Sequence, residues 1–86
     1  MVVVALGLAL EITRPDWCFL VLAIVSVWVA EALNTAFEFL CDVASPDFHP
    51  IVKHSKDVAA GAVLLSAVGA VILGLLVFVP YVEAYL

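Results

Sequence analysis

The segment that decides the fold of this chain is EALNTAFEFLCD, residues 31–42, which follows an uncharged run beginning at Trp17. Its polar side chains, named here the polar stripe, are Glu31, Asn34, Glu38 and Asp42. An α-helix turns by about 100° per residue, so the other three lie within about 60° of Glu31 on one face. A charge facing lipid tails at mid-bilayer costs at least about 2.5–3.5 kcal/mol on insertion scales. The stripe must therefore face protein, water, a metal or a polar ligand.

The composition around the stripe is that of a membrane protein. Of the 86 residues, 67% are hydrophobic, and the mean hydropathy is +1.30, whereas soluble domains are about 45–50% apolar. We expect one all-α integral membrane domain with up to three transmembrane helices. The net charge of −5, with Arg14, Lys53 and Lys56 as the only cations, argues against nucleic-acid binding, which needs a basic face. Cys18 and Cys41 are interpreted as small apolar residues within helices, and a disulfide or a metal site stays the alternative.

The order of elements follows from prolines and polar residues. The expected elements are a partial first helix over 2–13, a second helix over 17–41 that carries the stripe, a loop over 42–56 and a third helix over 57–79. The first segment is shorter than the roughly 20 residues that span a bilayer, so we expect it to be the second half of a truncated helix. The loop contains both lysines, and cytoplasmic loops carry excess Lys and Arg, so we place it in the cytoplasm.

Small residues recur every four positions on the third helix, which lets helix backbones approach closely in lipid. They are Ala62, Ser66, Ala70 and Gly74. This ladder is compatible with packing inside one chain and with an oligomer interface, and the sequence leaves both open.

Depth separates the two glutamates of the stripe. At about 1.5 Å per residue, Glu31 lies roughly 21 Å from Trp17, which is some 9 Å inside a hydrocarbon core of about 30 Å. Glu38 lies about 10 Å further along, near water. A desolvated carboxylate can act as a general base, and one at the water edge can hold Mg²⁺ with phosphate oxygens. The layout indicates a reaction between a lipid and a soluble phosphate donor; the structural alternative is hydrogen bonding between helices.

Two motifs resemble one known family. EALNTAFE (31–38) and CDVASPDFHPIVKHSKDVAAGAVLL (41–65) are similar to the prokaryotic integral-membrane diacylglycerol kinases, which include undecaprenol kinases. The resemblance implies three membrane helices per chain, a homotrimer and active sites between subunits at the cytoplasmic face of the bacterial inner membrane. It implies transfer of the ATP γ-phosphate, with Mg²⁺, to the hydroxyl of a membrane lipid alcohol, either undecaprenol or diacylglycerol.

The resemblance also implies roles for individual residues. Glu31 matches the general base, which also contacts the lipid, and Glu38 matches a Mg²⁺ ligand at the nucleotide. Asn34 and Asp42 occupy supporting positions. The remaining matches are Asp47, Phe48 and His49 in the loop near the nucleotide, Lys56 and Asp57 at ATP, and Ala60 on the lipid path.

One part of the family pattern has no match. The family has an N-terminal amphipathic helix that supplies a further glutamate for Mg²⁺, and no residue here corresponds to it. An inactive truncated paralogue therefore stays an alternative, as does a membrane assembly or ion-pathway subunit. The amino-acid sequence of the two motifs is more similar to the undecaprenol kinase branch of the family.

Overall fold

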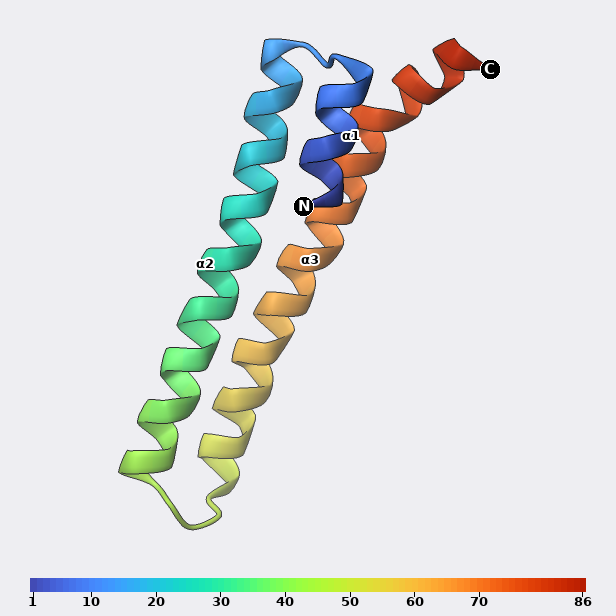
Figure 1. The fold of residues 1–86 in the computed structure, drawn as a ribbon. Helices are drawn as coiled ribbons and strands as arrows, with labels where there is room; N and C mark the ends of the chain where they lie inside the picture. The colour runs from blue at the N-terminus through green and yellow to red at the C-terminus, as the bar shows by residue number, and fades with distance from the viewer.

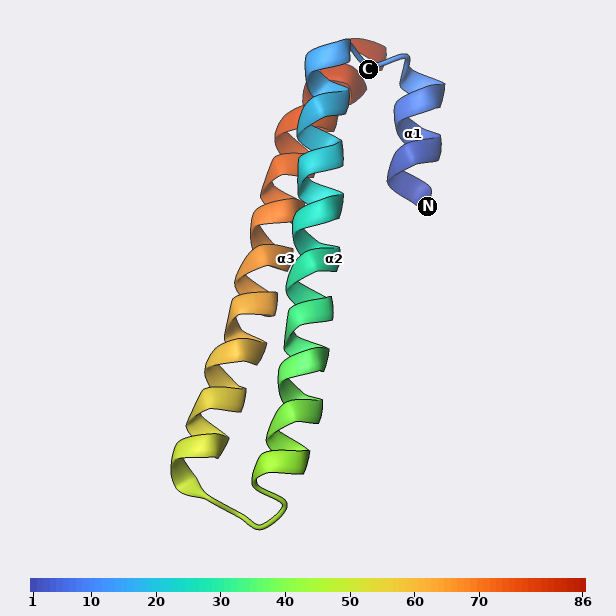
Figure 2. The ribbon, with the colours of Figure 1, turned by 90° about the vertical axis from the view of Figure 1, so that its left-hand side faces the viewer.

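The computed structural model describes residues 1–86 and consists of helices and no strands. They are α1 (Val2–Leu10), α2 (Arg14–Ala44) and α3 (Pro50–Tyr85). Helices α2 and α3 run antiparallel, side by side, and are joined by a short loop, while α1 stands beside the opposite end of the pair (Figures 1 and 2). The molecule is a rod of 55 × 18 × 16 Å.

The long hairpin packs through a seven-residue repeat. On α2 the buried or half-buried positions include Leu20, Val27, Asn34 and Cys41, and a spacing of seven is typical of left-handed helix pairs. Three members of the small-residue ladder, Ser66, Ala70 and Gly74, are half-buried, whereas Ala62 is exposed. The structure therefore supports packing within the chain for most of the ladder.

The end of the hairpin away from the loop is held by an apolar cluster. Ile12, Leu20, Val77 and Phe78 form its buried centre, and Val3, Leu10, Trp17 and Tyr81 pack against it. Helix α1 ends at Leu10, and the left-handed backbone of the capping residue Glu11 (φ 52°, ψ 51°) turns the chain toward α2. Gly7 lets α1 approach closely, because a Cβ there would lie 2.8 Å from Cη2 of Trp17.

A hydrogen-bond network connects the chain segments at the same end. The Tyr81 hydroxyl donates to Oδ2 of Asp16 at 2.6 Å and accepts from the backbone N–H of Thr13 at 3.0 Å. The Thr13 hydroxyl donates to the same carboxylate oxygen at 3.0 Å. This hydrogen-bond network joins the α1–α2 connection to the last turns of α3.

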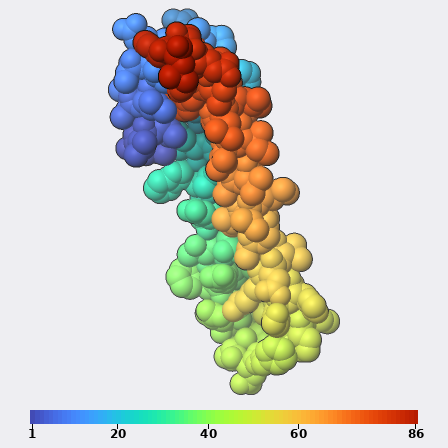
Figure 3. Space-filling view, turned by 90° about the vertical axis from the view of Figure 1, so that its right-hand side faces the viewer, coloured from blue at the N-terminus to red at the C-terminus, as the bar shows by residue number.

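Most of the molecule is uncovered apolar surface. Only 6 of 86 residues are buried, and the space-filling view shows α1 covering one end of the rod, with the side chains of α2 uncovered beyond it (Figure 3). Both α2 and α3 are long and apolar enough to cross a membrane. Since so much apolar surface is unfavourable in water, the all-α membrane fold expected from the sequence is confirmed.

The predicted element boundaries were too short for both long helices. The predicted loop 42–56 shrinks to residues 45–49, because α2 continues to Ala44 and α3 begins at Pro50. Prolines at the first helical positions cost nothing, since the N–H they lack would have no partner there. Pro15 and Pro50 therefore start helices instead of separating them.

The other end of α3 also differs from the prediction. The helix passes through Pro80 to Tyr85 instead of ending at residue 79. Proline removes one backbone hydrogen bond and bends the helix, and the last turns of α3 swing away from the axis of the hairpin (Figure 1). At the chain start, α1 ends at Leu10 and not at residue 13, because Glu11 is left-handed.

Candidate active site

The polar stripe lies on one uninterrupted helix, as its spacing predicted. Glu31, Glu38 and Asp42 are exposed, and Asn34 is half-buried. Glu31 and Glu38 have no hydrogen-bonding partner on α3, whereas Asn34 turns toward that helix and Asp42 reaches it through the side chain of Lys56. The face is open to a ligand or to another protein chain.

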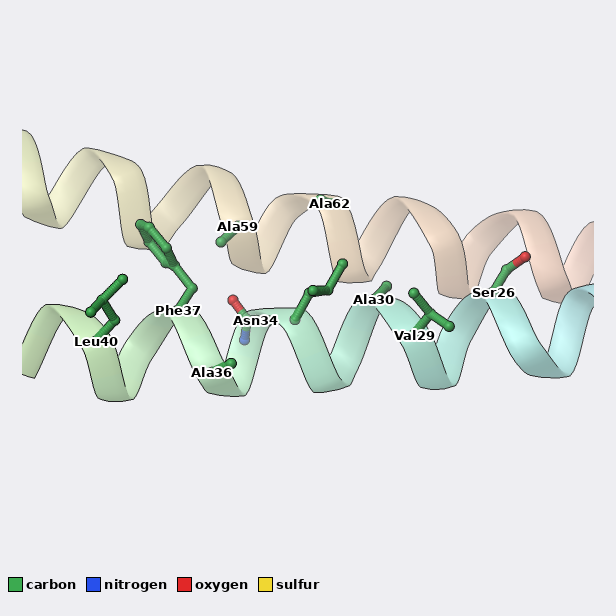
Figure 4. A pocket seen from close by; sticks show the side chains of 10 residues that line it. Ser26, Val29, Ala30, Asn34, Ala36, Phe37, Leu40, Ala59 and Ala62 are labelled. Atoms are coloured by element: carbon green, nitrogen blue, oxygen red, sulfur yellow. The ribbon is translucent and has the colours of Figure 1, made fainter.

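Asn34 occupies an apolar groove between the two long helices. The groove has a volume of about 770 Å³ and is lined mostly by apolar side chains. Val29, Leu33, Phe37 and Leu40 line it from α2, and Ala59 and Ala62 from α3. The Asn34 amide points between the helices toward Ala59 (Figure 4). Its Oδ1 atom is buried and has no hydrogen-bond partner within the chain, which is unfavourable for a polar atom.

Glu31 stands in a second hollow, of about 490 Å³, on the surface of α2. Trp28 and Phe39 line it together with small residues, and Ala36 belongs to both hollows. The sequence analysis missed both aromatic residues, although helical angles of about 60° and 80° place them on the same side of α2 as Glu31. Trp28 lies about one turn before Glu31 and Phe39 about two turns after it. The carboxylate thus has apolar neighbours on its own helix.

The loop end brings α2 and α3 together through an ion pair. Nζ of Lys56 donates to Oδ1 of Asp42 at 2.9 Å. This hydrogen bond raises the pKa of Lys56, and the negative charges of Asp42, Cys41 when ionised, and Glu38 act in the same direction. Lys56 lies in the first two turns of α3, which begin before its apolar span. The pair therefore places a cation at the water end of the stripe.

Lys56 and Asp57, which the resemblance treats as a unit, have different partners. Asp57 accepts a hydrogen bond from Lys53 at 2.9 Å, one turn earlier on α3. The spacing of four residues was visible in the sequence as a helical ion pair, but the loop predicted over 42–56 concealed it. Ala60 is exposed on α3, one turn beyond Lys56.

The predicted loop residues lie at the turn between the helices. Phe48 is 78% exposed, and Asp47 is also exposed, with its backbone carbonyl accepting from Ser45 at 3.3 Å. Nδ1 of His49 accepts from the backbone N–H of Ile51 at 3.2 Å and caps α3. That atom is therefore engaged, while the aromatic ring of Phe48 is free to contact a ligand.

A magnesium ion could be held here only with help from a ligand. No group of three or more His, Cys, Asp or Glu side chains converges in the structure. Glu38 and Asp42 offer carboxylates one helical turn apart, and Mg²⁺ commonly uses one or two carboxylates together with phosphate oxygens. The residues present fit Mg²⁺ bound with a phosphorylated molecule, not a site built by this chain alone.

Comparison with known proteins shows the family of the chain. The family model described as "Prokaryotic diacylglycerol kinase" matches residues 1–78. The chain belongs to the prokaryotic diacylglycerol kinase family. It is 40% identical over 74 residues to a protein named "Undecaprenol kinase" from Bacillus subtilis (strain 168). It is 46% identical over 63 residues to a "Diacylglycerol kinase" from Synechocystis sp..

The family match does not extend over whole relatives. The alignments cover 86% and 70% of this chain, but only 60% of the Bacillus protein and 36% of the Synechocystis protein. No solved structure matches the chain.

Proposed function

We propose that this chain takes part in phosphorylating a membrane lipid alcohol, with ATP as the phosphate donor and Mg²⁺ as the metal. The observation that carries the proposal is the polar stripe, which runs along α2 from Glu31 to the Asp42–Lys56 ion pair near the loop. The spacing from Trp17 predicts that Glu31 lies at membrane depth. Family membership and the names of the two relatives support a lipid kinase. The acceptor is undecaprenol or diacylglycerol, and the amino-acid sequence of the motifs favours undecaprenol.

Each part of the stripe has a role in this proposal. Glu31 takes the proton of the lipid hydroxyl as its oxygen bonds to the γ-phosphorus of ATP, while the bond to the bridging β–γ oxygen breaks and ADP leaves. Phosphoryl transfer depends mainly on alignment and charge neutralisation, and a general base contributes typically about 10²–10⁴-fold. Asn34, one turn after Glu31 on α2, would orient the reacting groups.

The nucleotide would occupy the loop end. Glu38 would hold Mg²⁺, which neutralises phosphate charge when bound, and Asp42 supports that end of the stripe. Lys56 and Asp57 would contact ATP, and Asp47, Phe48 and His49 would lie in the loop near the nucleotide. Ala60, one turn along α3, would border the lipid path.

The proposal includes assembly as a homotrimer in the bacterial inner membrane, with the site facing the cytoplasm. One observation supports association, the large exposed apolar surface of both long helices. A neighbouring subunit could cover the open face of α2 and supply the missing metal ligand.

The test uses the purified chain in mixed micelles with Mg²⁺ and γ-labelled ATP, offering undecaprenol and diacylglycerol side by side. Label transfer to one lipid supports the kinase and identifies its acceptor. Absence of transfer to both lipids from a folded chain would contradict the proposal and favour an inactive assembly partner. ATP-independent proton flux in liposomes would favour the ion-pathway alternative.

A further inference from the structure

Both lysines of the chain form an ion pair, and the two pairs have the same length but different geometry. Lys53 bonds to Asp57 within one turn of α3, and Lys56 bonds to Asp42 across the hairpin, each at 2.9 Å. The first pair is the ordinary one of a helix surface. The second fixes the end of a side chain from α3 against the polar stripe of α2.

The location of the second pair gives it a possible use beyond stability. An exposed ion pair contributes little to folding because the two side chains lose conformational freedom and water screens the charges. Asp42 lies one turn after Glu38 on α2, so the pair brings the Lys56 ammonium to the same end of the stripe as that carboxylate. The lysine stem is flexible, with four carbons between backbone and ammonium, and nothing on α3 itself pairs with it.

We propose that Asp42 is a positioning residue for the nucleotide, holding the Lys56 ammonium beside the polar stripe where it meets the phosphates of ATP. This inference rests on the proposed function and names a partner for its nucleotide site. An ammonium has three N–H donors, so Lys56 can keep its bond to Asp42 and donate to a phosphate oxygen. Asp42 itself need not touch the nucleotide.

Charge alone would predict the opposite effect of removing Asp42. Glu38, Asp42 and Lys56 together carry a net charge of −1, and one carboxylate fewer would attract the negatively charged ATP more strongly. If positioning prevails, Asp42→Asn weakens ATP binding in spite of the more favourable charge. The sign of the change therefore separates the two explanations.

The kinetic test measures KM for ATP and kcat at saturating lipid for wild type and variants. We expect Asp42→Asn to raise KM for ATP about 10-fold, as losing a charged hydrogen bond would, with kcat changed less than about 2-fold and Asp42→Glu partly restoring KM. In a Lys56→Gln background Asp42→Asn should have no further effect. Glu83→Gln, which removes one carboxylate from the far end of α3, controls for net charge. A KM that falls or stays the same in Asp42→Asn, or effects that multiply independently of Lys56, would overturn the proposal.

A binding test separates this inference from the kinase reaction itself. Because the chain has only two lysines, selective ¹³Cε labelling gives two lysine signals, and Lys53 is the internal reference. We expect Mg²⁺ with a non-hydrolysable ATP analogue to shift the Lys56 signal in the wild type and to require about 10-fold more analogue in Asp42→Asn. This result supports positioning even if no lipid is phosphorylated. An unmoved Lys56 signal in the wild type would overturn it.

Discussion

The two ends of the hairpin treat their polar groups in opposite ways. At the α1 end, Thr13, Asp16 and Tyr81 satisfy one another above an apolar cluster. Toward the loop, Glu31 lies exposed and Asn34 has a buried oxygen without a partner. The first end is complete within one chain, whereas the second offers unused carboxylate and amide groups. Under the proposed function, the first end maintains the fold and the second contains the groups that bind substrates.

Removing the carboxylate of Glu31 should have the largest effect on lipid phosphorylation. Glu31→Gln keeps the shape of the side chain but cannot accept a proton, so we expect lipid phosphorylation to fall by about 10²–10⁴-fold with an unchanged unfolding transition. The assay is transfer of labelled phosphate in mixed micelles. Glu11→Gln, which alters a carboxylate at the other end of the hairpin, is the control. Equal transfer by both variants would exclude Glu31 as the base.

The opposite end should respond to crowding at α1. In Gly7→Val the new side chain would occupy space now filled by Trp17 and Ile12. We expect the free energy of unfolding, measured by detergent-mixture denaturation, to fall by about 1–3 kcal/mol.

Gly69 provides a matched control for this substitution, because a Cβ there would meet nothing within 4 Å. Gly69→Val carries the same change in helix propensity without the clash. If both variants lose the same stability, the close approach of α1 does not contribute to the fold.

Removing the Tyr81 hydroxyl from the hydrogen-bond network should cause a smaller loss of stability. Tyr81→Phe deprives Asp16 of a donor and the Thr13 N–H of its acceptor, at a cost of about 1–2 kcal/mol. Tyr85→Phe is the control, since Tyr85 is 74% exposed. The prediction is measured in the same denaturation assay, and lipid phosphorylation per folded molecule should not change. A loss of catalysis in Tyr81→Phe would show that the two ends are coupled.

The smallest effect is expected from the pH dependence of the Lys56 pair. Because its pKa is raised in the folded chain by the bond to Asp42, the stabilisation is fully present below the unfolded value of about 10.4. It is lost as the pH rises through the higher folded pKa. NMR titration of labelled lysine should show Lys56 losing its proton at lower pH in Asp42→Asn than in the wild type. Coincident titration curves would show that the pair does not persist in solution.

The sequence was sufficient for the membrane class and the register of the stripe, because both depend on composition and helical periodicity. It misplaced the helix ends, since the sequence does not show whether a proline lies in the first turn of a helix, where its missing N–H has no cost, or inside a helix. Pro50 begins α3, and Pro80 is carried inside it. The pairing of Lys53 with Asp57 also depends on those boundaries, because both residues must lie on one helix. Pairing across the hairpin requires the tertiary fold, which no spacing rule contains.

The rigidity of α2 has a consequence for the bilayer itself. Glu31 and Glu38 belong to one unbroken helix, so their separation of about 10 Å along the axis is fixed. Reacting atoms must come within about 3–3.5 Å. Under the proposed function, the lipid alcohol must rise toward its headgroup region or the triphosphate must dip below the surface. The helix would then set the distance between the lipid site and the nucleotide site. Because acyl-chain length changes membrane thickness, the turnover rate should vary with the acyl-chain length of the host membrane.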